Sequence, residues 1–166
     1  MYVDNNLIVS GGYSAANVQF SQVPISTGTT LSTNVIDLGT ARDMGEGAAD
    51  IFMRVQVGNA AATVFLGGTS VEIQAIASSD AAQSANIIVL GSTGAIPMAS
   101  LTVAALALSS RFSVNLSPLP GLKGQRYLSA RIIVLGTNTQ LGQVFIDFGI
   151  EIQDGQKFYP AGSAIL

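Results

Sequence analysis

The sequence has 166 residues, only 10% of them charged, and contains no histidine, cysteine or tryptophan. This length predicts one domain, large enough to fold around its own core without disulfide or metal support. The missing residue types exclude an imidazole base, a Ser-His-Asp triad, a thiolate nucleophile, disulfides and metal sites built from Cys or His. Seven basic residues and a net charge of −3 argue against a nucleic-acid partner.

No membrane partner and no secretory signal are expected. The first six residues lack the basic start and the apolar run of a signal peptide. Residues 81–110 are uncharged, but polar and turn-forming residues interrupt them before 18 consecutive apolar residues accumulate.

Residues 1–34 are expected to form a partly extended N-terminal arm ahead of a single β-sandwich domain at residues 35–166. Short apolar pieces such as residues 7–9 alternate with glycines, Pro24 and polar turn residues. Gly permits positive φ and Pro removes a backbone donor, so long strands are not expected there. Such an arm can add one edge strand or reach over a neighbouring molecule.

From residue 35 onward, short apolar or alternating segments predict a series of β-strands. A period of two places successive side chains on opposite faces of a strand, and Gly-rich turns separate the segments. The expected strands cover residues 35–38, 51–57, 64–66, 71–75, 87–90, 112–116, 127–135 and 144–152. The segment 87–90 is continuously apolar, which predicts burial on both faces.

The strand at 144–152 carries the clearest alternation. Val144, Ile146 and Phe148 share one face, and the residues between them share the other. This pattern predicts one face on a core and the other toward solvent or a partner.

One segment is a candidate helix. Residues 99–108 are rich in Ala and Leu, although Thr102-Val103 weakens the pattern. Eight or so short strands with Gly-rich turns predict an all-β fold, an antiparallel jelly-roll-like β-sandwich with an extended N-terminal arm.

Two segments have some features of ligand sites. The stretch 45–50 begins like a dinucleotide loop, but Asp50 stands where the third Gly belongs and a strand follows. Four acidic residues lie close together and could supply oxygen ligands to calcium: Asp37, Asp43, Glu46 and Asp50. Their spacing matches no known calcium loop, which favours a solvated, salt-bridged loop.

Carboxylate pairs are the remaining route to catalysis in a chain without His or Cys. Asp147 and Glu151 share a strand face, but they lie about 13 Å apart along an extended strand, too far for the usual glycosidase pair. We therefore expect no enzyme activity, no catalytic residue, no cofactor and no metal site.

The low charge content points to contacts with other subunits. A free monomer usually keeps its surface charged for solubility, and neutral polar surface is desolvated at lower cost than unpaired charge. Arg126-Tyr127 and Phe158-Tyr159 combine residue types that are enriched at protein interfaces.

Four segments are distinctive in their order and spacing: Ser32–Gly47, Leu90–Pro97, Gly124–Leu128 and Asp147–Asp154. The first of them contains Asp37-Leu38-Gly39, followed by an Arg-Asp-Met-Gly element. Together the four segments resemble the capsid cement, or decoration, proteins of tailed bacteriophages, specifically the family known from a short-tailed Bordetella phage. The likeness runs from about residue 30 to the C-terminus.

The resemblance implies a jelly-roll β-sandwich that binds the outer surface of an icosahedral phage head and bridges neighbouring major capsid protein subunits. It also implies self-association, for which we expect a dimer or a trimer. Synthesis and assembly are expected in the bacterial host cytoplasm, and the final location on the outer capsid surface of the virion. A protein that binds the expanded shell but not its free subunits stabilises that shell by mass action.

The interface residues are predicted from their types and positions. Apolar pieces on an arm are expected to remain unburied within the chain, and the loop at 42–46 and the C-terminal aromatic pair complete the set. The predicted interface residues are Tyr2, Leu7, Ile8, Phe20, Arg42, Met44, Glu46, Arg126, Tyr127, Phe158 and Tyr159.

The alternative is a carbohydrate- or receptor-binding β-sandwich module of a phage tail or surface structure. Such sites usually present exposed aromatic platforms, often Trp, beside carboxylates. The absence of Trp and the presence of only four Tyr make this alternative weaker. An enzyme is the third possibility, and no spacing in the sequence supports one.

Overall fold

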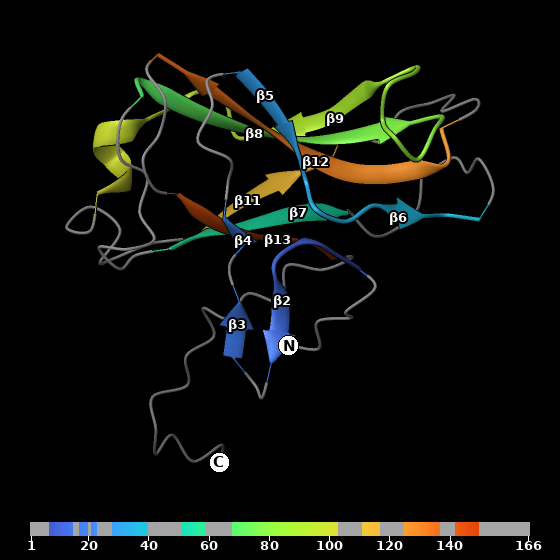
Figure 1. The fold of residues 1–166 in the computed structure, drawn as a ribbon, viewed down its shortest axis with the longest axis horizontal. Coiled ribbons are helices and arrows are strands. Elements are labelled where there is room, and N and C mark those ends of the chain that lie inside the picture. The colour runs from blue at the N-terminus through green and yellow to red at the C-terminus, as the bar shows by residue number, and fades with distance from the viewer. Residues whose placement is uncertain are drawn as a thin grey trace, which may run out of the picture.

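The computed structural model describes residues 7–14, 17–19, 21–22, 28–39, 51–58, 68–102, 111–116, 125–136 and 142–149. In this part of the chain, two antiparallel β-sheets pack face to face as an upper and a lower layer (Figure 1). The predicted all-β sandwich is therefore confirmed. No helix in the described part is long and apolar enough to cross a membrane.

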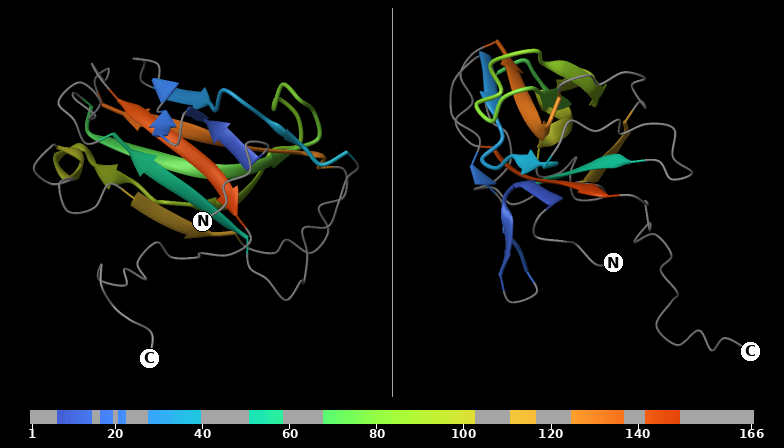
Figure 2. Two further views of the ribbon diagram at one scale, coloured as in Figure 1. Left: turned by 90° about the horizontal axis from the view of Figure 1, so that it is seen from below. Right: turned by 90° about the vertical axis from the view of Figure 1, so that its right-hand side faces the viewer.

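The lower layer, named the β13 sheet, is built on strand β13 (Gln143–Gly149). Its order is β1 (Ile8–Ser10), β13, β7 (Phe52–Val57) and β11 (Arg111–Asn115). A short strand, β4 (Ser21–Gln22), pairs with β13 on the same side as β1. A hairpin of β2 (Gly12–Ser14) and β3 (Asn17–Gln19) projects from this layer away from the upper one (Figure 1; Figure 2, right).

The upper layer, named the β12 sheet, is built on strand β12 (Tyr127–Leu135). Its order is β10 (Ile96–Pro97), β8 (Ser70–Ser78), β12 and β5 (Gly28–Leu31). Strand β9 (Ile88–Ser92) lies on the same side of β8 as β10, and β6 (Ile36–Asp37) lies on the same side of β12 as β5. The 3-10 helix η2 (Met98–Leu101) follows β10.

The connectivity is that of a jelly roll. When β1 and β4, β5 and β6, and β9 and β10 are each counted as one strand position, the described strands fill four positions in each sheet, ordered β1/β4–β13–β7–β11 and β9/β10–β8–β12–β5/β6. In chain order, each position lies in the other sheet from the one before it, except that β9/β10 follows β8 within the β12 sheet, which is the pattern of two Greek keys. The order of the strands in the two sheets therefore agrees with the jelly-roll-like sandwich expected from the sequence.

The core lies between the two sheets and takes alternate residues from each strand. Met53, Val55 and Val57 enter it from β7, and Val144, Ile146 and Phe148 enter it from β13, as the alternation predicted. From the upper layer, β8 contributes Val71, Ile73, Ala75 and Ala77, and β12 contributes Leu128, Ala130, Ile132 and Val134. The opposite faces of the same strands are therefore directed away from the core.

The N-terminal segment is part of the sandwich to a greater extent than expected. Strands β1 and β4 pair with β13, and β5 pairs with β12, so residues before position 35 supply strands to both sheets. Val9 is fully buried in the core, and its carbonyl accepts a hydrogen bond from the Asn34 backbone N–H at 2.8 Å. These strands thereby cover one side of β13 and of β12, whose backbone groups would otherwise lie at a sheet edge.

Strand β9 corrects the expectation for residues 87–90. Leu90 is buried, but Ile87 and Val89 are 38% and 41% exposed, so burial on both faces is wrong. The reason is topological, because β9 lies at an edge of the β12 sheet and only one face of that sheet meets the core. Helix η2 covers the first part of the helix candidate at 99–108, while residues 103–108 and the expected strand at 64–66 lie outside the described residues.

Candidate interface

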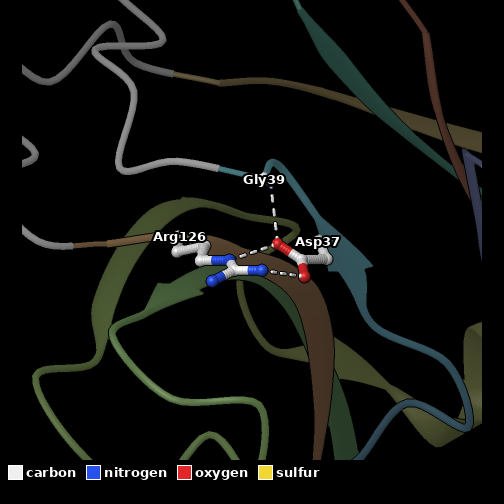
Figure 3. A network of polar contacts seen from close by, with 3 residues as sticks. All are labelled: Asp37, Gly39 and Arg126. Carbon is white, nitrogen blue, oxygen red and sulfur yellow. Dashed lines mark hydrogen bonds and ion pairs between the residues drawn. The ribbon is translucent and has the colours of Figure 1, made fainter.

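Asp37 and Arg126 form an exposed ion pair where β6 meets the start of β12. The Nε of Arg126 donates to Oδ1 of Asp37 at 2.5 Å, and the Nη2 donates to Oδ2 at 2.6 Å. The backbone N–H of Gly39 donates to the same Oδ1 at 2.8 Å (Figure 3). This bidentate geometry fixes the plane of the guanidinium as well as its position.

Backbone bonds and one ring contact hold Arg126 in place. Its N–H donates to the Ser78 carbonyl and its carbonyl accepts from the Leu38 N–H, both at 3.0 Å. Its guanidinium lies over the Tyr127 ring, 5.3 Å from the centroid, at a distance typical of cation–π contacts. Asp37, Gly39, Arg126 and Tyr127 are named the Arg126 cluster below.

The Arg126 cluster is charged and oriented, yet open to solvent. Hydrogen bonds from the Arg126 side chain and from the Gly39 backbone lower the pKa of Asp37, and the bond to Asp37 raises the pKa of Arg126. The side chains of Arg126 and Asp37 remain 43% and 45% exposed. Ion pairs with this exposure add little to stability, so stability does not account for the ordered arrangement.

The cluster joins two of the segments that carry the resemblance, since Asp37 and Gly39 belong to Ser32–Gly47 and Arg126 belongs to Gly124–Leu128. A family model for Bbp16 matches residues 20–146, which include the whole cluster. The chain belongs to the Bbp16 family. This family is one of Bordetella phage proteins, which confirms the broader part of the resemblance. No curated protein matches the chain.

In this Bbp16 family member, the structure brings together only some of the predicted interface residues. Arg126 and Tyr127 are adjacent in the Arg126 cluster, and Leu7 is half-buried directly before β1. The remaining predicted residues, except Ile8, lie outside the described part of the chain: Tyr2, Phe20, Arg42, Met44, Glu46, Phe158 and Tyr159.

Ile8 requires a correction. The sequence predicted that it would lie unburied on an arm, but it is only 4% exposed and sits in β1, opposite Asp147 of β13. Pairing with β13 places the Ile8 side chain on the outward face of the β13 sheet beside Asp147, where it is covered, so Ile8 is not available to a partner in this structure.

Asp37 is the functional candidate that the sequence did not single out. The sequence pattern placed it only among the members of an acidic loop, whereas the structure pairs it with an arginine 89 residues away. The Asp-x-Gly spacing signals a local turn, because an Asp side chain often accepts from the N–H two residues on. That signal identifies the turn but not the distant partner.

No metal site is evident in the part of the chain that the structure describes. No group of three or more His, Cys, Asp or Glu side chains is placed to hold an ion there. Asp43, Glu46 and Asp50, from the acidic cluster, lie outside the described residues, as does Glu151.

Asp147, expected on a face open to solvent or a partner, is 1% exposed. On the outward face of the β13 sheet, the Nε of Arg54 donates to Oδ1 of Asp147 at 3.0 Å, and the Nη2 of Arg54 pairs with Oδ2. Burial raises the pKa of Asp147, and the bond from Arg54 opposes that effect. Phe145 lies on the same face and is also buried, so the chain itself covers the outward face of the β13 sheet at Phe145 and Asp147.

Asp80 organises the loop between β8 and β9. Its carboxylate accepts from the hydroxyls of Ser78 and Ser84 at 2.7 Å and from the backbone N–H groups of Ser84 and Ala85 at 2.9 and 3.0 Å. These bonds, with the Ser84 hydroxyl first, hold the pKa of Asp80 far below its ordinary value. The loop is therefore ordered by an ionised carboxylate.

Acid is expected to weaken this loop. Because the folded pKa of Asp80 is depressed, its contribution to stability is present above the unfolded value, near pH 4, and is lost as the pH falls further. Urea unfolding of the wild type should show a falling midpoint between about pH 5 and pH 2, and Asp80→Asn should show a smaller fall. An identical pH dependence in Asp80→Asn would contradict this assignment.

Proposed function

We propose that this Bbp16 family member is a capsid cement protein. It binds the outer surface of an icosahedral phage head, bridges neighbouring major capsid protein subunits and stabilises the expanded shell. The observation that carries the proposal is the family match over residues 20–146, which contains the segments resembling cement proteins up to Leu128. The proposed location is the outer capsid surface of the virion, after synthesis and assembly in the bacterial host cytoplasm.

The proposed mechanism is linkage rather than chemistry. A protein that binds the assembled shell more tightly than free shell subunits shifts the equilibrium toward the shell by its binding free energy. The jelly roll supports this role as a scaffold, since its described strands form two hydrogen-bonded sheets around one core. The fold alone does not decide function, because jelly rolls serve capsid and lectin domains alike.

The Arg126 cluster supports the proposal as a contact surface. Arg and Tyr are among the residue types that most often dominate the binding energy at interfaces. The Arg126 guanidinium uses its Nε and Nη2 on Asp37, and a guanidinium has five N–H donors, so donors remain for a partner. A side chain that is already oriented loses less conformational entropy when it binds.

The test is binding to expanded heads that lack this protein. Saturable co-sedimentation, together with a higher temperature of head disruption, would support the proposal. Mass spectrometry of purified virions should find the chain in hundreds of copies. Its absence from virions, no binding to heads, and robust sugar binding on a glycan array would together reject the proposal in favour of the carbohydrate-binding alternative.

Arg126→Ala is expected to weaken binding to heads by about 30-fold, the effect of losing roughly 2 kcal/mol at an interface hot spot. Arg126→Lys should lose an intermediate part of the binding affinity, because an ammonium keeps the charge but cannot make the bidentate pair. Ser113→Ala, on an exposed position of β11, is the control and should bind as the wild type does. Equal binding by all four proteins would remove the Arg126 cluster from the contact surface.

A further inference from the structure

Two glutamines are buried where the loop between β8 and β9 meets the start of β12. Gln83, in that loop, is 3% exposed, and Gln125, directly before Arg126, is 5% exposed. Within the described part of the chain, no group forms a hydrogen bond with Nε2 or Oε1 of Gln83 or with Oε1 of Gln125. A buried polar atom without a partner lowers stability, so such atoms in folded proteins call for an additional bonding partner.

Hydrogen bonds bring the two amides to the same segment of the loop. Nε2 of Gln125 donates to the carbonyl of Asn86 at 3.0 Å, and Asn86 follows Gln83 by three residues. The backbone N–H of Gln83 donates to the carbonyl of Asp80 at 3.1 Å, which folds the loop back on itself. The loop leaves β8 beside the start of β12 (Figure 1). The Gln125 amide therefore lies beside the loop segment that carries Gln83.

The backbone of Gln83 adds a second cost at this position. Its φ is +57°, in the left-handed region that residues other than Gly seldom adopt. Gly would adopt this φ without strain, and a Gln side chain that pointed into solvent would be fully hydrated. A strained backbone persists only where the surrounding structure compensates for it. The buried Gln83 amide is therefore expected to have bonding partners beyond the described side chains.

The free atoms indicate what kind of molecule fits between the two glutamines. Both Oε1 atoms accept hydrogen bonds and the Gln83 Nε2 donates, so a cation or an anion would meet at least one group of the wrong polarity. Exchanging the oxygen and nitrogen of the Gln83 amide still leaves one acceptor and one donor there. Water both donates and accepts, and a buried water typically makes about three hydrogen bonds, which matches these three atoms.

We propose that an ordered water molecule is bound between Gln83 and Gln125 and joins the loop between β8 and β9 to the start of β12. The water accepts from the Gln83 Nε2 and donates to the two Oε1 atoms. Because Gln125 directly precedes Arg126, the same water restrains the backbone that carries the Arg126 side chain toward Asp37. The site is formed by this chain alone and does not depend on the proposed function.

Nuclear magnetic resonance of the 15N-labelled wild type tests the site directly. A water that tumbles with the protein gives cross-peaks of opposite sign in NOESY and ROESY spectra, whereas rapidly exchanging hydration water does not. This signature is expected at the side-chain amide protons of Gln83 and Gln125. The exposed side-chain amide of Asn34 is the internal control and should lack it. No such signature at Gln83, or a direct hydrogen bond between the two glutamines in a high-resolution crystal structure, would overturn the proposal.

Gln83→Met tests whether the water depends on both amides, because it keeps the length of the side chain and removes its polar atoms. The bound-water signature at Gln125 should disappear. Hydrogen–deuterium exchange of the Arg126 backbone N–H, which donates to the Ser78 carbonyl, should become about tenfold faster, while amides in the middle of β12 keep their rates. Ala82→Met, at an exposed position of the same loop, is the matched control and should change neither measurement.

The two measurements fail in different ways. A bound-water signature that persists at Gln125 in Gln83→Met would overturn the bridging role of the water. Equal acceleration of exchange throughout β12 would show a global loss of stability and overturn the local link to Arg126. The wild-type spectra decide whether the water is present even if Gln83→Met fails to fold.

Discussion

Arg54→Met is expected to lower the free energy of unfolding by about 3–5 kcal/mol, the cost of leaving a buried charge without its partner. Asp147 is 1% exposed and takes two hydrogen bonds from the Arg54 side chain. Without the guanidinium, the carboxylate must stay charged in a poorly solvated site or take up a proton. Urea unfolding followed by circular dichroism measures the loss.

The double variant Arg54→Met/Asp147→Leu separates the pair from its parts. It should recover much of the stability, because replacing both charges with apolar groups of similar volume is often neutral. Arg126→Met is the control, since it removes an arginine from an exposed pair and should leave the unfolding midpoint almost unchanged. A double variant as unstable as Arg54→Met would mean that the ion pair itself, rather than an unpaired charge, holds the outward face of the β13 sheet together.

Gly136→Ala is expected to cost about 2–5 kcal/mol, the sum of backbone strain and overpacking. Gly136 directly follows β12 with φ of +93°, and an added Cβ would lie 2.7 Å from the backbone nitrogen of Thr69. That nitrogen cannot move freely, because it donates to the Leu135 carbonyl at 2.7 Å. The substitution therefore forces apart the ends of β8 and β12, the central pair of the β12 sheet.

Two other glycines separate the contributions. Gly94 has φ of +69° and an added Cβ would meet nothing within 4 Å, so Gly94→Ala should show strain alone, about 1–2 kcal/mol. At Gly91 a Cβ would lie 2.8 Å from Val114 Cγ1 and 2.9 Å from the Asn115 carbonyl oxygen, so Gly91→Ala should show crowding alone, about 1–3 kcal/mol. Thermal unfolding of the three variants should rank Gly136→Ala last in stability. A Gly136→Ala protein as stable as Gly94→Ala would refute the close approach to Thr69.

The sequence predicted the parts of the fold that depend on local pattern. Alternation in β7 and β13 identified their core faces, and the bounds of β12 agree with the predicted strand at 127–135. The exposure of β9 could not be predicted in the same way. An apolar run is identical in a central and an edge strand, and the order of strands in a sheet is set by contacts between distant segments.

In the candidate interface, too, local sequence features were predictable and contacts between distant segments were not. Residue type alone made Arg126 and Tyr127 candidates, because Arg and Tyr are enriched at protein interfaces. The partner Asp37 could not be found, since 89 residues separate the pair and only the meeting of β6 with β12 joins them. The prediction that Ile8 is unburied was wrong, because an apolar side chain is equally consistent with a contact surface and with a paired, buried strand.

The pairing of β1 with β13 has a consequence for biosynthesis. Ile8 lies opposite Asp147, so edge strand β1 cannot pair until β13, more than 130 residues later in the chain, has left the ribosome. Contacts this remote in sequence form slowly. We therefore expect a nascent chain arrested before residue 143 to remain protease-sensitive throughout the lower layer, and folding to finish only after translation has passed that point.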